Sequence, residues 1–186
     1  MNIMYFENVE NLHELEQNEQ WEVIRKSLYE QWLGQKDNLG ILVRLALECW
    51  LVMSDWDCCI NNEGLNYELF KSNLMDSYVY GLAHFGDNEK FLCLFGYMMS
   101  LFPYFFYLNN DKNSEKYLIY ENKGKSMLEK AYRNFSNNPL AKVLFLGSID
   151  QTKECDKAKM RLKLSLSSLF PGDTAIEKYF KEILSN

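Results

Sequence analysis

The sequence predicts an all-α protein, in which antiparallel helix hairpins stack as a short α-solenoid or pack as a compact bundle of about eight helices. Apolar residues recur at intervals of three and four along almost the whole chain, which is the spacing of one helix face. Polar breaks at 36–38, 86–88 and 136–139 lie roughly fifty residues apart, leaving room for two helices in each interval. We therefore expect a single helical domain over 1–186, and the sequence leaves open whether its acidic start, residues 1–18, is loosely ordered.

The N-terminal half shows three helical segments in order. The first has an apolar face at Trp21, Ile24, Leu28 and Trp32. It is expected to end near Gly34, because glycine favours helix ends. Residues 38–56, NLGILVRLALECWLVMSDW, form the next predicted helix, with Asn38 as its N-cap. A third stripe follows at Phe70, Leu74, Tyr78, Leu82 and Phe85.

Residues 91–108, FLCLFGYMMSLFPYFFYL, contain no charge and allow three interpretations: a membrane span, the wall of a ligand groove, or a soluble core. Eighteen apolar residues only just reach the length of a membrane-crossing helix, and the segment includes Gly96 and Pro103. It also lacks a flanking cluster of Lys or Arg that would orient a span. We expect a helix buried on all sides. Pro103 either kinks this helix or stands at the first position of a short new helix.

The C-terminal half continues the helical pattern. A stripe at Tyr120, Gly124, Met127, Ala131 and Phe135 precedes a polar turn. Pro139 then suits the first position of a helix over 139–149. Residues 160–167, MRLKLSLS, alternate like a strand, but a helical face also runs through Ala158, Leu162, Leu166 and Leu169. Because a lone strand would have no partner to pair with, we predict a helix here.

Two segments share a thirty-five-residue offset, FSNNPLAKVLF at 135–145 and FPGDTAIEKYF at 170–180. Together with Gly147, and with Pro171 twenty-four residues beyond it, the stretch 120–171 resembles the junction between tetratricopeptide repeats. Lys159 and Lys163 depart from that pattern, since they stand where small or aromatic residues are expected. The resemblance implies a helical scaffold that binds peptides or proteins, and it names no ligand.

Composition places the chain in a reducing, cytoplasmic compartment. The chain has five cysteines, which cannot all pair and form no C-x-x-C motif. They are Cys49, Cys58, Cys59, Cys93 and Cys155. The first fifteen residues lack the basic start and apolar block of a secretory signal. The two histidines, His13 and His84, have no metal-ligand spacing, so we predict no metal and no cofactor.

The sequence also lacks recognisable catalytic motifs. It has no glycine-rich phosphate loop, no H-E-x-x-H, no G-x-S-x-G and no paired-carboxylate motif. The run DWDCC at 55–59 groups carboxylates and thiols, but a solvated helix end followed by buried cysteines explains it as well. We therefore predict that the protein is not an enzyme.

Charge is distributed unevenly. Residues 1–110 carry 6 basic and 16 acidic side chains, a net charge of −10, whereas residues 111–186 carry 14 and 10, a net charge of +4. Such an acidic half is either a solvated face or a surface that recruits a basic protein. It disfavours nucleic acid, which needs a concentrated basic patch. The predicted partner-binding residues are Glu7, Glu10, Glu14, Glu16, Asp55, Asp57 and Glu63.

A small, acidic, all-helical chain without catalytic groups suggests a binding module with a protein partner. By analogy of charge and fold class, we hypothesise an immunity protein that neutralises a basic, nuclease-type bacterial toxin. One alternative is an acidic tetratricopeptide-like secretion chaperone. Another is a peptide or small-molecule sensor that uses the aromatic segment 91–108. Neither membrane nor nucleic acid is an expected partner, and the oligomeric state is open.

Overall fold

A computed structural model describes residues 9–58, 60–107 and 114–185 of the chain. Within these residues no strand is present, and eight helices have seven residues or more, which confirms the all-α prediction. The helices are α1 (Leu12–Gln17), α2 (Trp21–Gly34), α3 (Leu39–Ser54), α4 (Tyr67–Phe85), α5 (Glu89–Leu101), the 3₁₀ turn η1 (Pro103–Phe106), α6 (Ser114–Asn134), α7 (Pro139–Ser148), α8 (Thr152–Leu162), η2 (Lys163–Ser165), α9 (Leu166–Leu169) and α10 (Ala175–Ser185).

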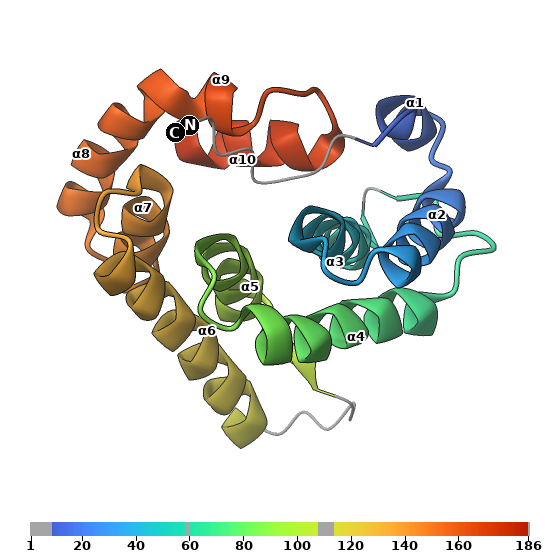
Figure 1. Ribbon diagram of the computed structural model, residues 1–186, viewed down its shortest axis with the longest axis horizontal. Helices are drawn as coiled ribbons and strands as arrows, with labels where there is room; N and C mark the ends of the chain where they lie inside the picture. Colours follow the sequence, from blue (N-terminus) through green and yellow to red (C-terminus); the bar gives the residue numbers. More distant parts are fainter. Residues whose placement is uncertain (1–8, 59, 108–113, 186) are drawn as a thin grey trace.

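The helices follow a closed course around a centre formed by α3 and α5 (Figure 1). Consecutive helices pack as antiparallel pairs, with the most extensive contacts between α3 and α4 and between α5 and α6. At the end of this course α10 contacts α3 and lies beside α1 (Figure 1). One continuous apolar core therefore joins the first helix to the last.

The two central helices are the most apolar elements. Every residue of α3 from Ile41 to Met53 is buried, and α5 buries Phe91–Gly96, Met98 and Met99. The expected burial is confirmed for most of 91–107, although Leu101 and Tyr104 are exposed, and residue 108 lies outside the described part. Pro103 opens the short helix η1 at its first position and does not kink α5. In the described residues, no helix combines the length and hydropathy needed to cross a bilayer.

Asparagine side chains cap the helices that follow the polar breaks. The side-chain oxygen Oδ1 of Asn38 accepts hydrogen bonds from the backbone amides of Gly40 and Ile41, at 3.0 and 3.3 Å, as the sequence predicted. Asn138 accepts from Leu140 N at 2.8 Å. These contacts satisfy amides that have no partner within the helix, so each break fixes where the next helix begins.

The segment 160–167 is helical and not a strand. It begins in the last turn of α8, passes through the 3₁₀ turn η2 and ends in α9. The predicted face is turned inward, since Ala158, Leu162 and Leu166 are buried and Leu169 is half-buried.

Glu16 and α10 hold the two ends of the chain together. Residues 12–17 form α1, which buries Leu12 and Glu16. The Glu16 carboxylate accepts a hydrogen bond at 2.7 Å from the amide of Ala175, the first residue of α10. Part of the acidic N-terminal segment 1–18 is therefore structured, while residues 1–8 lie outside the described part.

Candidate functional site

The predicted acidic residues form two separate surfaces at opposite ends of α3. Glu10 lines the same cavity as Ile41, which stands near the start of α3, whereas Asp55 follows the end of that helix. At 1.5 Å per residue, the fourteen residues from Ile41 to Asp55 span about 20 Å. Glu14 is exposed on α1 and does not line this cavity, whereas Asp57 and Glu63 follow Asp55 in the α3–α4 connection and belong to the second surface.

Two further predicted residues are Glu7 and Glu16. Glu7 lies outside the described residues. Glu16 is only 7% exposed and is enclosed between α1, α3 and α10. It stands one helical turn after Leu12, and both side chains lie on the inward face of α1. Glu16 therefore supports the fold and is not available to a partner.

The second surface combines acids with aromatic rings, and we call it the tyrosine–acid face. Its members come from the α3–α4 connection, from the start of α4, from η1 and from the start of α6: Asp55, Trp56, Asp57, Glu63, Tyr67, Glu68, Tyr104 and Tyr117. The Asn62 side chain donates to Trp56 O at 2.9 Å and so holds the connection in place. The Trp56 and Tyr67 rings meet edge to face with centroids 5.1 Å apart.

The ionisation of Tyr67 shows how closely these groups lie. Burial raises the pKa of Tyr67 to about 12, and the neighbouring Tyr104, Glu68 and Asp57 add to the shift. Burial likewise raises the pKa of Tyr104, with a contribution from Tyr117. These phenols are therefore neutral near neutral pH, where their hydroxyl groups can donate hydrogen bonds.

The tyrosine–acid face is suited to protein recognition. Tyr104 and Tyr117 are 42% and 38% exposed, so their rings are open to solvent. Tyrosine supplies a large apolar area with a polar tip, and it is enriched at protein interfaces. The face also lies at the C-terminal end of α3, where the helix dipole adds partial negative charge. A partner with an apolar centre and a basic rim would complement it.

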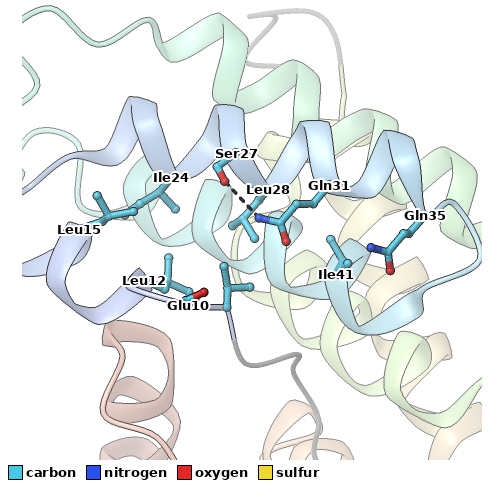
Figure 2. Close-up of a pocket in the computed structure, with 10 residues that line it drawn as sticks. Glu10, Leu12, Leu15, Ile24, Ser27, Leu28, Gln31, Gln35 and Ile41 are labelled. Carbon is cyan, nitrogen blue, oxygen red and sulfur yellow. Dashed lines mark hydrogen bonds between the residues drawn. The ribbon is translucent and has the colours of Figure 1, made fainter.

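The first surface surrounds a cavity of about 310 Å³ between α1, α2 and the start of α3 (Figure 2). Its apolar wall consists of Val9, Leu12, Leu15, Ile24, Leu28 and Ile41, and its polar members are Glu10, Ser27, Gln31 and Gln35. Figure 2 shows the polar α2 side chains following one another along the helix, with Leu12 and Glu10 across from them.

A buried ionic cluster lies between these two surfaces. Arg44 Nε is 3.0 Å from Glu48 Oε1, and Arg44 Nη2 is 3.8 Å from Glu16 Oε1. Burial raises the pKa of Glu48 to about 8, Arg44 opposes this shift, and the carboxylates of Glu16 and Glu177 increase it. Burial also raises the pKa of Glu16. Because the cluster is enclosed by helices, its proton chemistry concerns the fold more directly than a ligand.

The aromatic segment 91–108 contributes three residues to the wall of one cavity. Tyr97, Ser100 and Leu101 line one of about 240 Å³, together with residues of α7, α8 and α10. The Tyr97 and Tyr179 hydroxyl groups share a hydrogen bond of 2.7 Å beside it. Most of the remaining described segment packs inside the core, whereas Tyr104 is exposed and belongs to the tyrosine–acid face.

Trp56, Tyr67, Tyr104 and Tyr117 were not among the residues predicted from the sequence. Trp56 and Tyr67 could have been found, because they flank the acidic run that contains Asp57 and Glu63. Tyr104 and Tyr117 carry no such signal, since only the packing of η1 and α6 brings them to this face. Comparison of the chain with protein-family models, curated proteins and solved structures finds no match. No relative therefore supplies a role for any of these residues.

Proposed function

We propose that the protein is a non-enzymatic binding module that neutralises a basic protein, in the manner of an immunity protein against a nuclease-type toxin. The observation that carries the proposal is the tyrosine–acid face, where Tyr104, Asp57 and Glu68 surround Tyr67 and the solvent-open Tyr117 lies near Tyr104. Toxins that act on nucleic acid need a basic surface, and an acidic face with aromatic anchors can cover such a surface.

The charge of the chain supports the same proposal. The net charge of −10 over residues 1–110 attracts a basic partner over a distance set by ionic strength. Complementary charge accelerates association and excludes acidic competitors, while the aromatic rings supply contact area once the partner has docked.

The test compares two variants of equal charge. Asp57→Asn, Glu63→Gln and Glu68→Gln together neutralise three exposed acids of the tyrosine–acid face. The matched control neutralises three exposed acids elsewhere, at Glu19, Glu30 and Asp37. Both proteins are co-produced with basic, nuclease-type toxin domains, and cell survival and the association rate constant are measured.

We expect the face variant to lose protection and to associate about tenfold more slowly at low salt, while the control retains protection. If both variants lose activity to the same extent, net charge and not this face determines binding. If the face variant protects like the wild type, the proposal fails.

A second measurement separates the proposed function from that of a secretion chaperone. A neutralised toxin remains folded in the complex, so limited proteolysis should leave it intact. A chaperone client is held in a partly unfolded form and would be cleaved within the complex.

A further inference from the structure

We propose that the cavity between α1 and α2 binds an extended peptide segment of a partner protein, one that presents an aliphatic side chain and a neighbouring basic residue. This inference does not rest on the function proposed above, because it concerns the opposite end of α3 from the tyrosine–acid face. Three features of the cavity carry it: the spacing of its polar side chains, their unused hydrogen-bonding atoms, and its apolar floor beside Glu10.

Three polar side chains at the cavity are spaced like an extended polypeptide. Ser27 and Gln31 of α2 and Gln35, the residue directly after its end, are four residues apart and follow one another along the cavity (Figure 2). Four residues of helix rise about 6 Å. Two residues of an extended chain cover about 6.6 Å, and every second peptide group points to the same side. Consecutive members of the row therefore meet consecutive inward-facing residues of a bound strand.

Gln31 and Gln35 offer the two atoms that a peptide backbone requires. Gln31 Nε2 donates to Ser27 Oγ at 3.1 Å, so Gln31 Oε1 can accept from a peptide N–H. The Asn38 side chain donates to Gln35 Oε1 at 3.4 Å, so Gln35 Nε2 can donate to a peptide carbonyl. Neither of these two atoms has a partner among the residues that the structure describes. An acceptor and a donor one helical turn apart match the N–H and C=O of an extended chain.

The floor of the cavity selects an aliphatic side chain. Val9 and Leu15 line it and are half-buried, so they present accessible apolar surface. Leu12, Leu28 and Ile41 also line it and are fixed in the core, at most 3% exposed. The volume of about 310 Å³ exceeds the ~150 Å³ that suffices to take up benzene. One or two aliphatic side chains of a strand can therefore enter while its backbone lies along the glutamines.

Glu10 determines the charge of the ligand. Its exposed carboxylate lines the cavity and forms no ion pair with a described residue. A lysine or arginine next to the aliphatic anchor would complement it, whereas an acidic residue at that position would be repelled.

The test uses acetylated and amidated peptides of alternating leucine and threonine that contain one lysine, titrated into the full-length protein and followed by amide NMR shifts. Gln31→Ala with Gln35→Ala should weaken binding about tenfold, because two backbone hydrogen bonds are lost. The matched control is Lys26→Ala with Glu30→Ala, which changes exposed residues of the same helix outside the cavity. It should change the affinity by less than about twofold.

Two further comparisons identify the binding mode. Glu10→Gln should weaken the binding of the lysine peptide more than the binding of a peptide with glutamine in place of lysine. The control Glu14→Gln, on the exposed side of α1, should change the binding of neither peptide. N-methylation of the peptide nitrogens on one face of the strand should abolish binding. N-methylation of the nitrogens on the other face should leave binding intact. The inference is overturned if no peptide binds saturably below about 1 mM. It is equally overturned if the double glutamine variant binds like the wild type, or if N-methylation of either face has the same effect.

Discussion

Glu48 places an ionisable group in the most apolar part of the molecule. It is 1% exposed in the middle of α3, where Arg44 from the same helix, Glu16 and His13 from α1, and Glu177 from α10 act on the local charge. One arginine cannot compensate three ionised carboxylates in a medium that solvates charge poorly. Retaining a proton on Glu48 lowers this cost, which is why its pKa is raised to about 8.

Stability should therefore decrease as pH rises from about 4.5 to 8. In this window the unfolded chain has released the Glu48 proton and the folded protein still holds it, so folding is linked to proton uptake. We expect the Tm at pH 9 to be at least about 5 °C below that at pH 6. Glu48→Gln, which keeps the shape and removes the titration, should reduce this difference and raise the Tm at pH 9.

The control for this measurement is Glu14→Gln, which removes a carboxylate from the exposed side of α1. It should preserve the pH dependence of the wild type. Differential scanning calorimetry at several pH values measures both variants. Equal slopes for the wild type and for Glu48→Gln would mean that another group controls the transition.

The contact between α5 and α6 depends on two glycines. A Cβ at Gly124 would lie 2.6 Å from Ser100 N and 2.8 Å from Gly96 O. Both neighbouring atoms belong to the backbone of α5, so they cannot move without displacing the helix. Gly124→Ala should destabilise the protein by about 1–3 kcal/mol, although alanine is the better helix former. Chemical denaturation measures the change.

Gly147 provides a matched glycine without this constraint. It is exposed on α7, and a Cβ there would meet only Cys155 Sγ, at 3.8 Å. Gly147→Ala should be neutral or should stabilise the protein by up to about 1 kcal/mol. Equal destabilisation by both substitutions would exclude close packing as the reason for Gly124. Gly147 is also one of the residues that carry the tetratricopeptide resemblance. Close packing does not explain a glycine at this position.

Local chemistry made many of these elements predictable. Asn38 caps α3 because its side chain reaches amides two and three residues ahead, a relation contained in neighbouring residues. The apolar faces of α2 and α8 were predictable for the same reason, since burial follows their helical spacing. The sequence did not predict the 3₁₀ turn within 160–167. Lys163–Ser165 differs from an α-helix only in its tighter winding, which the spacing of apolar residues does not reveal.

The closed course of the helices depends on contacts between distant residues. Trp50 of α3 meets Tyr97 of α5 at 6.1 Å and Tyr179 of α10 at 5.5 Å between ring centroids, which joins three helices at one point. The Glu16 contact to Ala175 closes the course across 159 residues. An open array of helix hairpins has two independent ends, whereas here the first and last helices stabilise each other.

Such contacts explain why the candidate site could be predicted only in part. Asp57 and Glu63 are near each other in sequence and share a connection, so the acidic run identified them. Tyr104 and Tyr117 come together only because η1 packs against α4 and α6 packs against η1. The sequence likewise could not distinguish exposed Glu14 from buried Glu16, since the burial of Glu16 depends on Arg44 and α10.

Because the first and last helices contact each other, we expect a substitution that destabilises α10 to destabilise α1 as well. Phe180 is fully buried, stacks on Phe170 at 5.2 Å and lies 5.6 Å from Tyr97, so Phe180→Ala should cost about 3–5 kcal/mol. Amide hydrogen exchange should then accelerate in α1 and α10 more than in α6, because the Glu16 contact requires an ordered α10. Leu164→Ala, at a position that is 94% exposed, is the control and should leave exchange unchanged. Unchanged exchange in α1 beside accelerated exchange in α10 would show that the two ends behave independently, as in an open array.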